Sequence, residues 1–411
     1  MDDTAEFESW VRGELARSPL AEQGFAELLS RAVTILCRIR SVLAEPERRE
    51  KGKSVWQRLM KNGRMLKEVN EVLPIAARVL RWVDEVRPFA AGPITVLDLC
   101  SGVGYLSLLL SELLEASGPD IVARFVLVDH AWPRVDHAGA PMPHHINPEH
   151  LNLPGVWSHE IVCRRYDLKS SSGHRELAQH VLARAPGPVA VLGVHLCGLL
   201  SVRAVQLYND HPRCCFFALK PCCLPDSQLA RRAYVWQIGG HQIDARDVCG
   251  SGNNRYLHGK WRGDAPKELE RATFERWCEH LVAGIDVRAD GTKELSHYRL
   301  VGAAAERSEC HACSCDASKG HPAGAEKVST PTLRRAADTT AQDATDRCSS
   351  SGAKVKERDG GGSHSRHRYQ TAFLFAQRQY SPEDGMVSKI GGGPEEQFWR
   401  TPCHAPEASL Q

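Results

Sequence analysis

The chain has 411 residues, 42% of them hydrophobic, which is enough for one large domain or two ordinary ones with a sizeable core. Its 52 lysines and arginines nearly balance its 50 aspartates and glutamates, which excludes a global field that attracts nucleic acid or a membrane surface. The acidic start lacks an apolar signal segment, and no apolar run reaches the roughly 18 residues of a membrane span. The 15 cysteines are an odd number, so we expect reduced thiols and a cytoplasmic protein, with the nucleus left open.

Residues 1–90 are expected to form a helical region. Apolar residues recur at three- and four-residue steps from Leu28 to Ile39 and again from Val69 to Val83, as on the buried face of a helix. Between these stripes, residues 51–67 are rich in lysine and arginine. Such a segment is usually a solvated helix face, and a lid or substrate-docking element is the alternative.

Residues 91–305 alternate apolar runs with segments that are long enough for helices. The runs predict five strands, at residues 94–98, 124–129, 161–167, 189–195 and 214–220. Continuous apolar strands alternating with helices are typical of a parallel sheet covered on both faces. Two further strands, at 297–303 and 369–376, are expected to complete a seven-stranded, Rossmann-like α/β sheet with the last pair antiparallel.

Two polar stretches flank that last strand. Residues 306–368 are rich in Ser, Gly, Asp, Arg and Lys and poor in large apolar residues, so we expect a disordered insertion. Its Cys310, Cys313 and Cys315 are interpreted as incidental. Residues 369–380 then return to the main domain, and the tail at 381–411 is also expected to be disordered.

A glycine turn follows the first strand of this domain. Gly102 and Gly104 allow the backbone to pass close to a ligand, and the following helix offers unpaired N–H groups at its start. A dinucleotide fingerprint has a third glycine where this chain has Ser107. Asp98 would repel a pyrophosphate but suits a cationic amino-acid group. A second acid, Asp129, ends the next strand, where it can bind the hydroxyls of a ribose.

Polar residues also follow the third, fourth and fifth strands, where ligands bind in an open α/β sheet. These residues are Asp167, then His195 and Cys197, then Lys220, Cys222 and Cys223. The last two groups should face each other. Zn²⁺ would suit His and Cys, but the C-x₂-C spacing is missing and adjacent cysteines are poor joint ligands, so we expect no metal. We expect a polar pocket in which His195, or else Lys220, activates a nucleophile; a structural strand-end histidine is the alternative.

The pattern of acid, glycine turn and second acid resembles motifs I and II of class I S-adenosylmethionine (SAM) methyltransferases. The segments His195-Leu-Cys-Gly198 and Lys220-Pro-Cys-Cys-Leu224 resemble the signature of one subfamily, which includes the eukaryotic tRNA acceptor-stem 2′-O-methyltransferase, methyltransferase-like proteins and the glutathione S-transferase C-terminal-domain-containing protein. The resemblance covers about residues 55–305 and 369–378. It implies SAM as the methyl donor, bound by Asp98, Cys100, Gly102, Gly104, Asp129 and Asp167, and it does not fix the acceptor.

A loop at residues 247–262 completes the candidate site. It carries cations, including Arg255 and Lys260, beside the aromatics Tyr256 and Trp261. Cations position phosphates and aromatics stack on bases, so RNA, as a tRNA ribose or base, is the acceptor we expect, with Cys197, Cys222, Cys223, Arg255 and Lys260 binding the substrate. An ordinary surface loop is the alternative. Methylation of a protein side chain, or an inactive methyltransferase fold that serves as a binding module, are the other functions considered. No membrane or obligate protein partner is expected.

Overall fold

The computed structural model describes most of the chain up to residue 300 and one later segment. The described residues are 3–44, 49–133, 146–151, 153, 155–249, 256–257, 260–261, 267–289, 291–300 and 371–380. The predicted insertion at 306–368 with its three cysteines, the tail at 381–411 and Arg255 lie outside these residues. Lys260 is described in its backbone alone.

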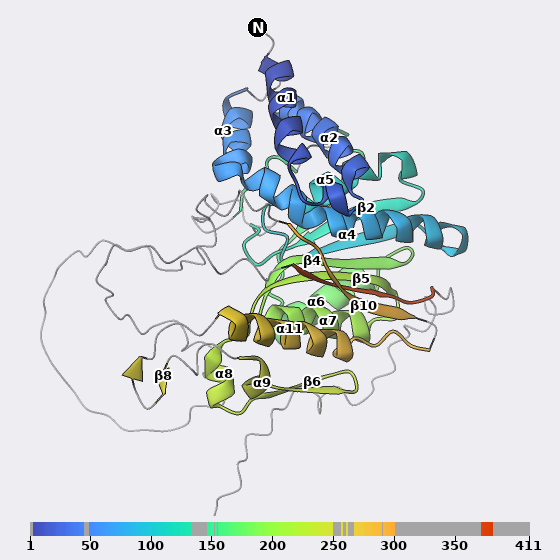
Figure 1. Cartoon of the computed structure of the whole chain (residues 1–411). Coiled ribbons are helices and arrows are strands. Elements are labelled where there is room, and N and C mark those ends of the chain that lie inside the picture. Colours follow the sequence, from blue (N-terminus) through green and yellow to red (C-terminus); the bar gives the residue numbers. More distant parts are fainter. Residues whose placement is uncertain are drawn as a thin grey trace, which may run out of the picture. The chain divides into compact units, whose positions relative to one another are not determined.

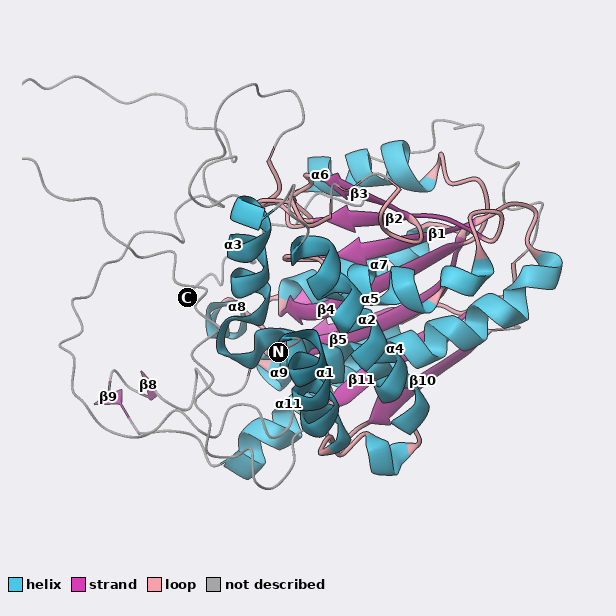
Figure 2. Ribbon diagram, turned by 90° about the horizontal axis from the view of Figure 1, so that it is seen from above, coloured by secondary structure: helices cyan, strands magenta, loops and turns pink. Residues whose placement is uncertain are grey.

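Seven strands form one sheet, in the order β10-β11-β5-β4-β1-β2-β3 (Figure 2). Neighbouring strands are parallel except where β11 pairs with β5 and with β10. This is the Rossmann-like seven-stranded sheet that the sequence predicts. The strands are β1 (Ile94–Leu99), β2 (Val122–Val128), β3 (Glu160–Arg164), β4 (Val189–Cys197), β5 (Cys214–Cys223), β10 (Thr292–His297) and β11 (Ala372–Gln377).

The prediction for the sixth strand is wrong in position. The strand β10 covers Thr292–His297 and shares only His297 with the expected range of 297–303, of which residues 301–303 lie outside the described part. Along β10 every side chain is exposed or half-buried, because the strand lies at the sheet edge and pairs with β11 alone. The apolar run that suggested a strand therefore follows β10 instead of forming it. The expected antiparallel pairing of the last two strands is confirmed.

Helices cover both faces of the sheet (Figure 1). Successive strand residues alternate between two apolar cores: Val96 lies in one and Leu97 in the other. This alternation explains why the strands read as continuous apolar runs. The first core is covered by α1 (Asp3–Ala16), α2 (Ala26–Ala44), α3 (Arg49–Met60), α4 (Arg64–Val86) and α5 (Tyr105–Leu113), and the second by α6 (Ser171–Leu177), α7 (Leu199–Asp210) and α11 (Lys267–Gly284).

Shorter elements complete the described part. After β5 come α8 (Ser227–Arg231), a hairpin of β6 (Val235–Ile238) and β7 (His241–Asp244), α9 (Ala245–Val248), and the paired β8 (Tyr256–Leu257) and β9 (Lys260–Trp261). Among the described residues, no helix combines the length and the apolar composition that crossing a bilayer requires.

The two helical stripes predicted in the first 90 residues are confirmed. Leu29, Val33, Leu36 and Ile39 are buried on α2, and most of the stripe from Val69 to Val83 is buried on α4. The helix α4 packs against β4 and β5. Its buried face includes two acids as well as apolar residues, and these acids bear on the site described next.

Candidate functional site

The turn after β1 has the backbone geometry that a close ligand approach requires. Gly102 and Gly104 have positive φ, at +56° and +82°. A Cβ on Gly102 would meet nothing within 4 Å, whereas one on Gly104 would lie 2.6 Å from a methyl group of Leu127. Cys100 also has a positive φ of 52°, which costs a non-glycine residue about 1–3 kcal/mol and is typical of functional turns. The space beside Gly102 is therefore where the turn can admit a ligand.

The two acids predicted to hold the cofactor flank this turn. Asp129 follows β2, and its carboxylate accepts hydrogen bonds from the backbone N–H of Gly102 at 3.1 Å and of Ala131 at 2.9 Å. Asp98, on β1, accepts a hydrogen bond of 2.8 Å from the hydroxyl of Ser107. Ser107 stands where a dinucleotide fingerprint has its third glycine, and it serves here to hold the Asp98 side chain.

Asp98 is buried, and its carboxyl group ionises at a higher pH than that of an exposed aspartate. Burial raises the pKa of Asp98 to about 7, with further contributions from the charges of Asp129 and Glu68, while the hydrogen bond from Ser107 lowers it. A cationic ligand group beside this carboxyl would favour its ionised form. The environment thus suits the cationic amino-acid group that the sequence indicated.

Two other residues predicted to contact the cofactor are placed differently. Burial raises the pKa of Cys100, with Asp129, Asp98 and Cys197 adding to the shift, so these groups lie within electrostatic reach of one another. Asp167 lies beyond the end of β3, is exposed, and accepts a hydrogen bond of 2.9 Å from the backbone N–H of Lys169. Its role toward an adenine stays a prediction.

The two predicted acceptor-activating residues meet in a buried ion cluster with helix α4. The His195 Nε2 atom lies 2.7 Å from a carboxylate oxygen of Glu71 and 3.5 Å from one of Glu68. The Lys220 Nζ atom lies 3.1 Å from the other carboxylate oxygen of Glu71, and Lys220 has no exposed surface. Glu71 therefore bridges the ends of β4 and β5.

The electrostatics of this cluster favour charged forms. Burial opposes ionisation of Glu71, but the charges of Lys220 and His195 together lower the pKa of Glu71 well below its usual range. Burial likewise opposes protonation of His195, but Glu68 and Glu71 raise the pKa of His195 above 6.5. The cluster thus stabilises the protonated form of His195 relative to a free imidazole.

Sequence reasoning missed Glu68 and Glu71. Both are charged residues directly after the lysine- and arginine-rich segment at 51–67, and each resembles a member of a solvated helix face. The sequence did contain a signal, which is the helical spacing of these acids relative to the apolar residues. The buried face of α4 includes residues at three- and four-residue steps, namely Met65, Glu68, Val72 and Ile75. Acidic residues that share the helical spacing of an apolar stripe indicate that buried basic groups pair with them.

Irregular pairing between β4 and β5, with a β-bulge on each strand, orients the remaining site residues. Val194 pairs with Lys220 and Leu196 with Pro221, so His195 is an extra residue on β4, with a φ of 62°. Bulges of this kind occur next to active sites, where they redirect a side chain. The predicted facing of the two polar groups is confirmed, because the Sγ atom of Cys197 lies 3.1 Å from that of Cys222.

The basic segment at residues 51–67 packs against the helix that follows the glycine turn. Val55 and Leu59 are buried, and the Tyr105 hydroxyl at the start of α5 donates a hydrogen bond of 2.9 Å to the Leu59 carbonyl. The Arg64 guanidinium lies over the Tyr105 ring, 5.6 Å from its centroid. A docking or lid role for this segment stays a prediction.

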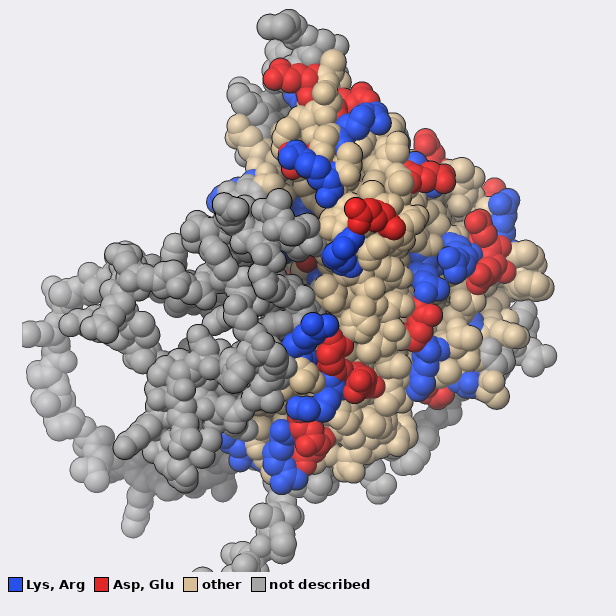
Figure 3. All heavy atoms as spheres, in the orientation of Figure 1, with Lys and Arg blue, Asp and Glu red and all other residues tan. Residues whose placement is uncertain are grey.

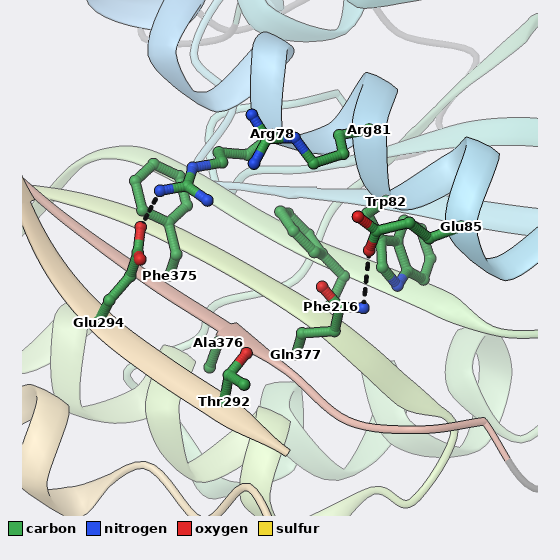
Figure 4. A pocket seen from close by; sticks show the side chains of 10 residues that line it. All are labelled: Arg78, Arg81, Trp82, Glu85, Phe216, Thr292, Glu294, Phe375, Ala376 and Gln377. Atoms are coloured by element: carbon green, nitrogen blue, oxygen red, sulfur yellow. Dashed lines mark hydrogen bonds and ion pairs between the residues drawn. The ribbon is translucent and has the colours of Figure 1, made fainter. Parts of the chain in front are cut away.

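The pocket in Figure 4 lies toward the opposite end of the strands. It is lined by the second half of α4, by the first residues of β5 and β10, and by the last residues of β11. Arg78 forms an ion pair with Glu294, and the Gln377 side-chain amide donates to Glu85 at 3.1 Å. These contacts join α4 to the sheet edge, so the pocket is distinct from the carboxyl-edge site.

The two glycines of the turn predict a paired result. Gly104→Ala should lower the free energy of unfolding by about 2–5 kcal/mol, because the left-handed backbone costs about 1–2 kcal/mol and the crowding against Leu127 costs about 1–3 kcal/mol. Gly102→Ala should cost only the backbone part, about 1–2 kcal/mol. Urea denaturation of both variants measures the difference. Equal losses would contradict the packing described for Gly104.

Comparison with known proteins adds only weak structural similarity. No family model matches the chain, and neither does any curated protein. Among solved structures, the plantazolicin methyltransferase BpumL in complex with SAH matches over 68% of this chain and 84% of that one, with 10% identity and a TM-score of 0.26. A likeness this low assigns neither fold nor activity, and the strand order and register remain the basis for the fold.

Proposed function

We propose that the chain is a SAM-dependent methyltransferase that acts on a macromolecular acceptor, with RNA as the first candidate. One observation carries the proposal: the open glycine turn after β1, bounded by Asp98 and Asp129, lies at the carboxyl edge of the seven-stranded sheet. Among the described strands of this sheet, β11 alone runs antiparallel to its neighbours β5 and β10. Ligands of open α/β sheets bind at this edge.

The residues of the turn fit the parts of SAM. The open side of Gly102 gives room for a ligand close to the backbone. Asp98 offers a carboxyl to the ammonium of the methionine part, and Asp129 offers one to the ribose hydroxyls. Each oxygen of Asp129 accepts one backbone hydrogen bond, and an ionised carboxylate has about four acceptor positions, so hydroxyl donors can still be bound.

Methyl transfer from SAM requires little beyond the alignment of the donor and the acceptor. Bound SAM supplies an electrophilic methyl group, and holding donor and acceptor in line can contribute about 7–11 kcal/mol to barrier reduction. The residues at the ends of β4 and β5 would orient the acceptor, and His195 would take part in removing its proton. Lys220 is fully buried as an ion-pair partner of Glu71, so it would hold Glu71 in place and would not act as a base. An amine that is already a nucleophile would need less of this help.

Support for an RNA acceptor comes from the loop after α9. The described backbone pairs Tyr256 with Trp261 and Leu257 with Lys260 in two short antiparallel strands, so the two aromatic residues are partners in the register. Cationic and anionic side chains are interspersed on the face shown in Figure 3, so the described residues of that face form no broad basic surface. A protein acceptor is the alternative, and an inactive binding module is disfavoured by the intact acids and glycines.

Cofactor binding is the first test of this proposal. Calorimetry should detect binding of SAM and SAH but not of NAD. Asp129→Ala should weaken SAM binding about ten- to hundredfold, since each hydrogen bond to a charged acceptor contributes about 1.5–3 kcal/mol. Asp226→Ala is the matched control, because Asp226 also accepts from the backbone N–H two residues later, at the start of α8. Equal affinity for NAD, or an unaffected Asp129→Ala variant, would overturn the proposal.

The acceptor requires a separate experiment. SAM labelled with tritium on its methyl group should transfer label to an RNA fraction of a cell extract in the presence of the chain. Label in protein alone would replace the RNA acceptor by a protein side chain. SAM binding without transfer to either fraction would favour the binding-module alternative.

A further inference from the structure

Three cysteine sulfurs gather at the ends of β4 and β5. The Sγ atom of Cys197 lies 3.1 Å from that of Cys222 and 3.4 Å from that of Cys223, and the latter two are 3.5 Å apart. These separations exceed the roughly 2.05 Å of a disulfide bond. The three sulfurs therefore form a compact triangle, with Cys222 buried, Cys197 half-buried and Cys223 exposed.

Irregular strand pairing makes this triangle from residues that a regular strand would separate. Cys197 pairs with Cys223 across the two strands, which leaves Cys222 as an extra residue on β5. Neighbouring residues of a regular strand point to opposite faces, and this was the reason to doubt adjacent cysteines as joint ligands. At the bulge the alternation is broken, and both sulfurs turn toward Cys197.

Gly198 allows the two strand ends to approach. It has a φ of +48°, and a Cβ there would lie 3.1 Å from the Cα atom of Pro225. Its N–H donates to the Cys223 carbonyl at 3.3 Å. The sulfur triangle is thus held by backbone contacts between β4 and β5.

The size of the triangle matches a metal ion. Zn²⁺ binds thiolate sulfur at about 2.3 Å, and a point at that distance from all three sulfurs exists about 1.2 Å off their plane. Among the described residues, the cluster contains three potential ligands, so one tetrahedral position is left over. Closed structural zinc sites have four protein ligands, whereas sites with three keep an open position for water or a substrate.

We propose that Cys197, Cys222 and Cys223 are thiolate ligands of a Zn²⁺ ion with one open coordination position. On binding, each thiol loses its proton to solvent and forms a sulfur–zinc bond. Soft thiolate ligands select Zn²⁺ over Mg²⁺ or Ca²⁺. The exposed Cys223 provides the entry path. The inference stands apart from the proposed function, because it needs neither SAM nor a methyl acceptor.

Metal content and cobalt spectroscopy test the site directly. The full chain, prepared under reducing conditions, should bind one Zn²⁺ that the Cys197→Ser/Cys222→Ser/Cys223→Ser variant lacks. The same chain loaded with Co²⁺ should show sulfur-to-cobalt charge-transfer bands, and the triple variant should lose them. Cys223→Ser alone, an exposed position that folding should tolerate, is expected to weaken Zn²⁺ binding by about tenfold or more.

Two control variants separate this site from the other cysteines of the chain. Cys310→Ser/Cys313→Ser/Cys315→Ser removes the cysteine cluster of the 306–368 segment, and Cys37→Ser removes one thiol on α2. Both should retain the ion and the charge-transfer bands. Retention of the ion by the triple variant, its loss in the Cys310 control, or a Cys197–Cys222 disulfide in reduced protein in place of metal would each overturn the proposal.

Discussion

Replacing Glu71 by glutamine is expected to lower the free energy of unfolding by about 3–5 kcal/mol, because it leaves the buried ammonium of Lys220 without its carboxylate partner. Glutamine keeps the size of the side chain, so the loss reports the charge and not a cavity. Urea denaturation at pH 6 measures it. Asp84→Asn, at an exposed position of the same helix, is the control and should stay within about 0.5 kcal/mol of the parent.

A second variant distinguishes an ion-pair effect from a general packing defect. Glu71→Gln combined with Lys220→Met removes both partners, so no uncompensated charge is left inside, and most of the lost stability should return. If the double variant is as unstable as Glu71→Gln alone, the loss comes from packing and the assigned pairing is wrong.

The pKa shifts of Glu71 and His195 predict the pH range in which the ion cluster stabilises the fold most. Glu71 has a lowered pKa, so its contribution is complete above its ordinary value of 4.5 and is lost as the pH falls below it. His195 has a raised pKa, so its contribution is complete below 6.5 and is lost as the pH rises through its higher folded value. The stability difference between the parent and Glu71→Gln should therefore be largest between about pH 4.5 and 6.5.

Much of the sheet could be predicted because both of its faces are covered. A strand such as β1 is buried at every position, since Val96 and Leu97 enter different cores, and such predominantly apolar runs are visible in the sequence. The edge strand β10 escaped detection for the opposite reason. Its residues pair on one side only and remain exposed or half-buried, so Thr292–His297 has no apolar run to reveal it.

The site also contains residues that local sequence patterns predict and residues that they do not. The turn with Gly102 and the acid at Asp129 could be predicted, since short local patterns encode them. Glu71 could not be assigned a role from its neighbours, because Lys220 lies 149 residues away in the sequence. The close approach of the three cysteine sulfurs depends on two bulges, which the apolar pattern of β4 and β5 does not encode.

His195→Ala is expected to reduce methyl transfer by about 10²–10⁴-fold if the acceptor is a hydroxyl, because general-base help has that magnitude. SAM affinity should change little, since a group that acts on the acceptor stabilises the transition state and not the bound donor. His241→Ala in the β6–β7 hairpin is the control and should retain the parent rate. Single-turnover transfer to the labelled acceptor fraction, with calorimetry of SAM in parallel, measures both quantities.

The pH profile of this reaction tests the role more sharply than the rate alone. Glu68 and Glu71 raise the pKa of His195, so kcat/KM should rise with pH through that raised pKa as the proton-accepting form becomes populated. Glu68→Gln removes the carboxylate 3.5 Å from the His195 Nε2 atom and should move the rise toward lower pH. A structural histidine would lower stability without moving the profile. A near-normal rate in His195→Ala would remove it as the base and favour an amine acceptor, which needs no base to become a nucleophile, over a ribose hydroxyl.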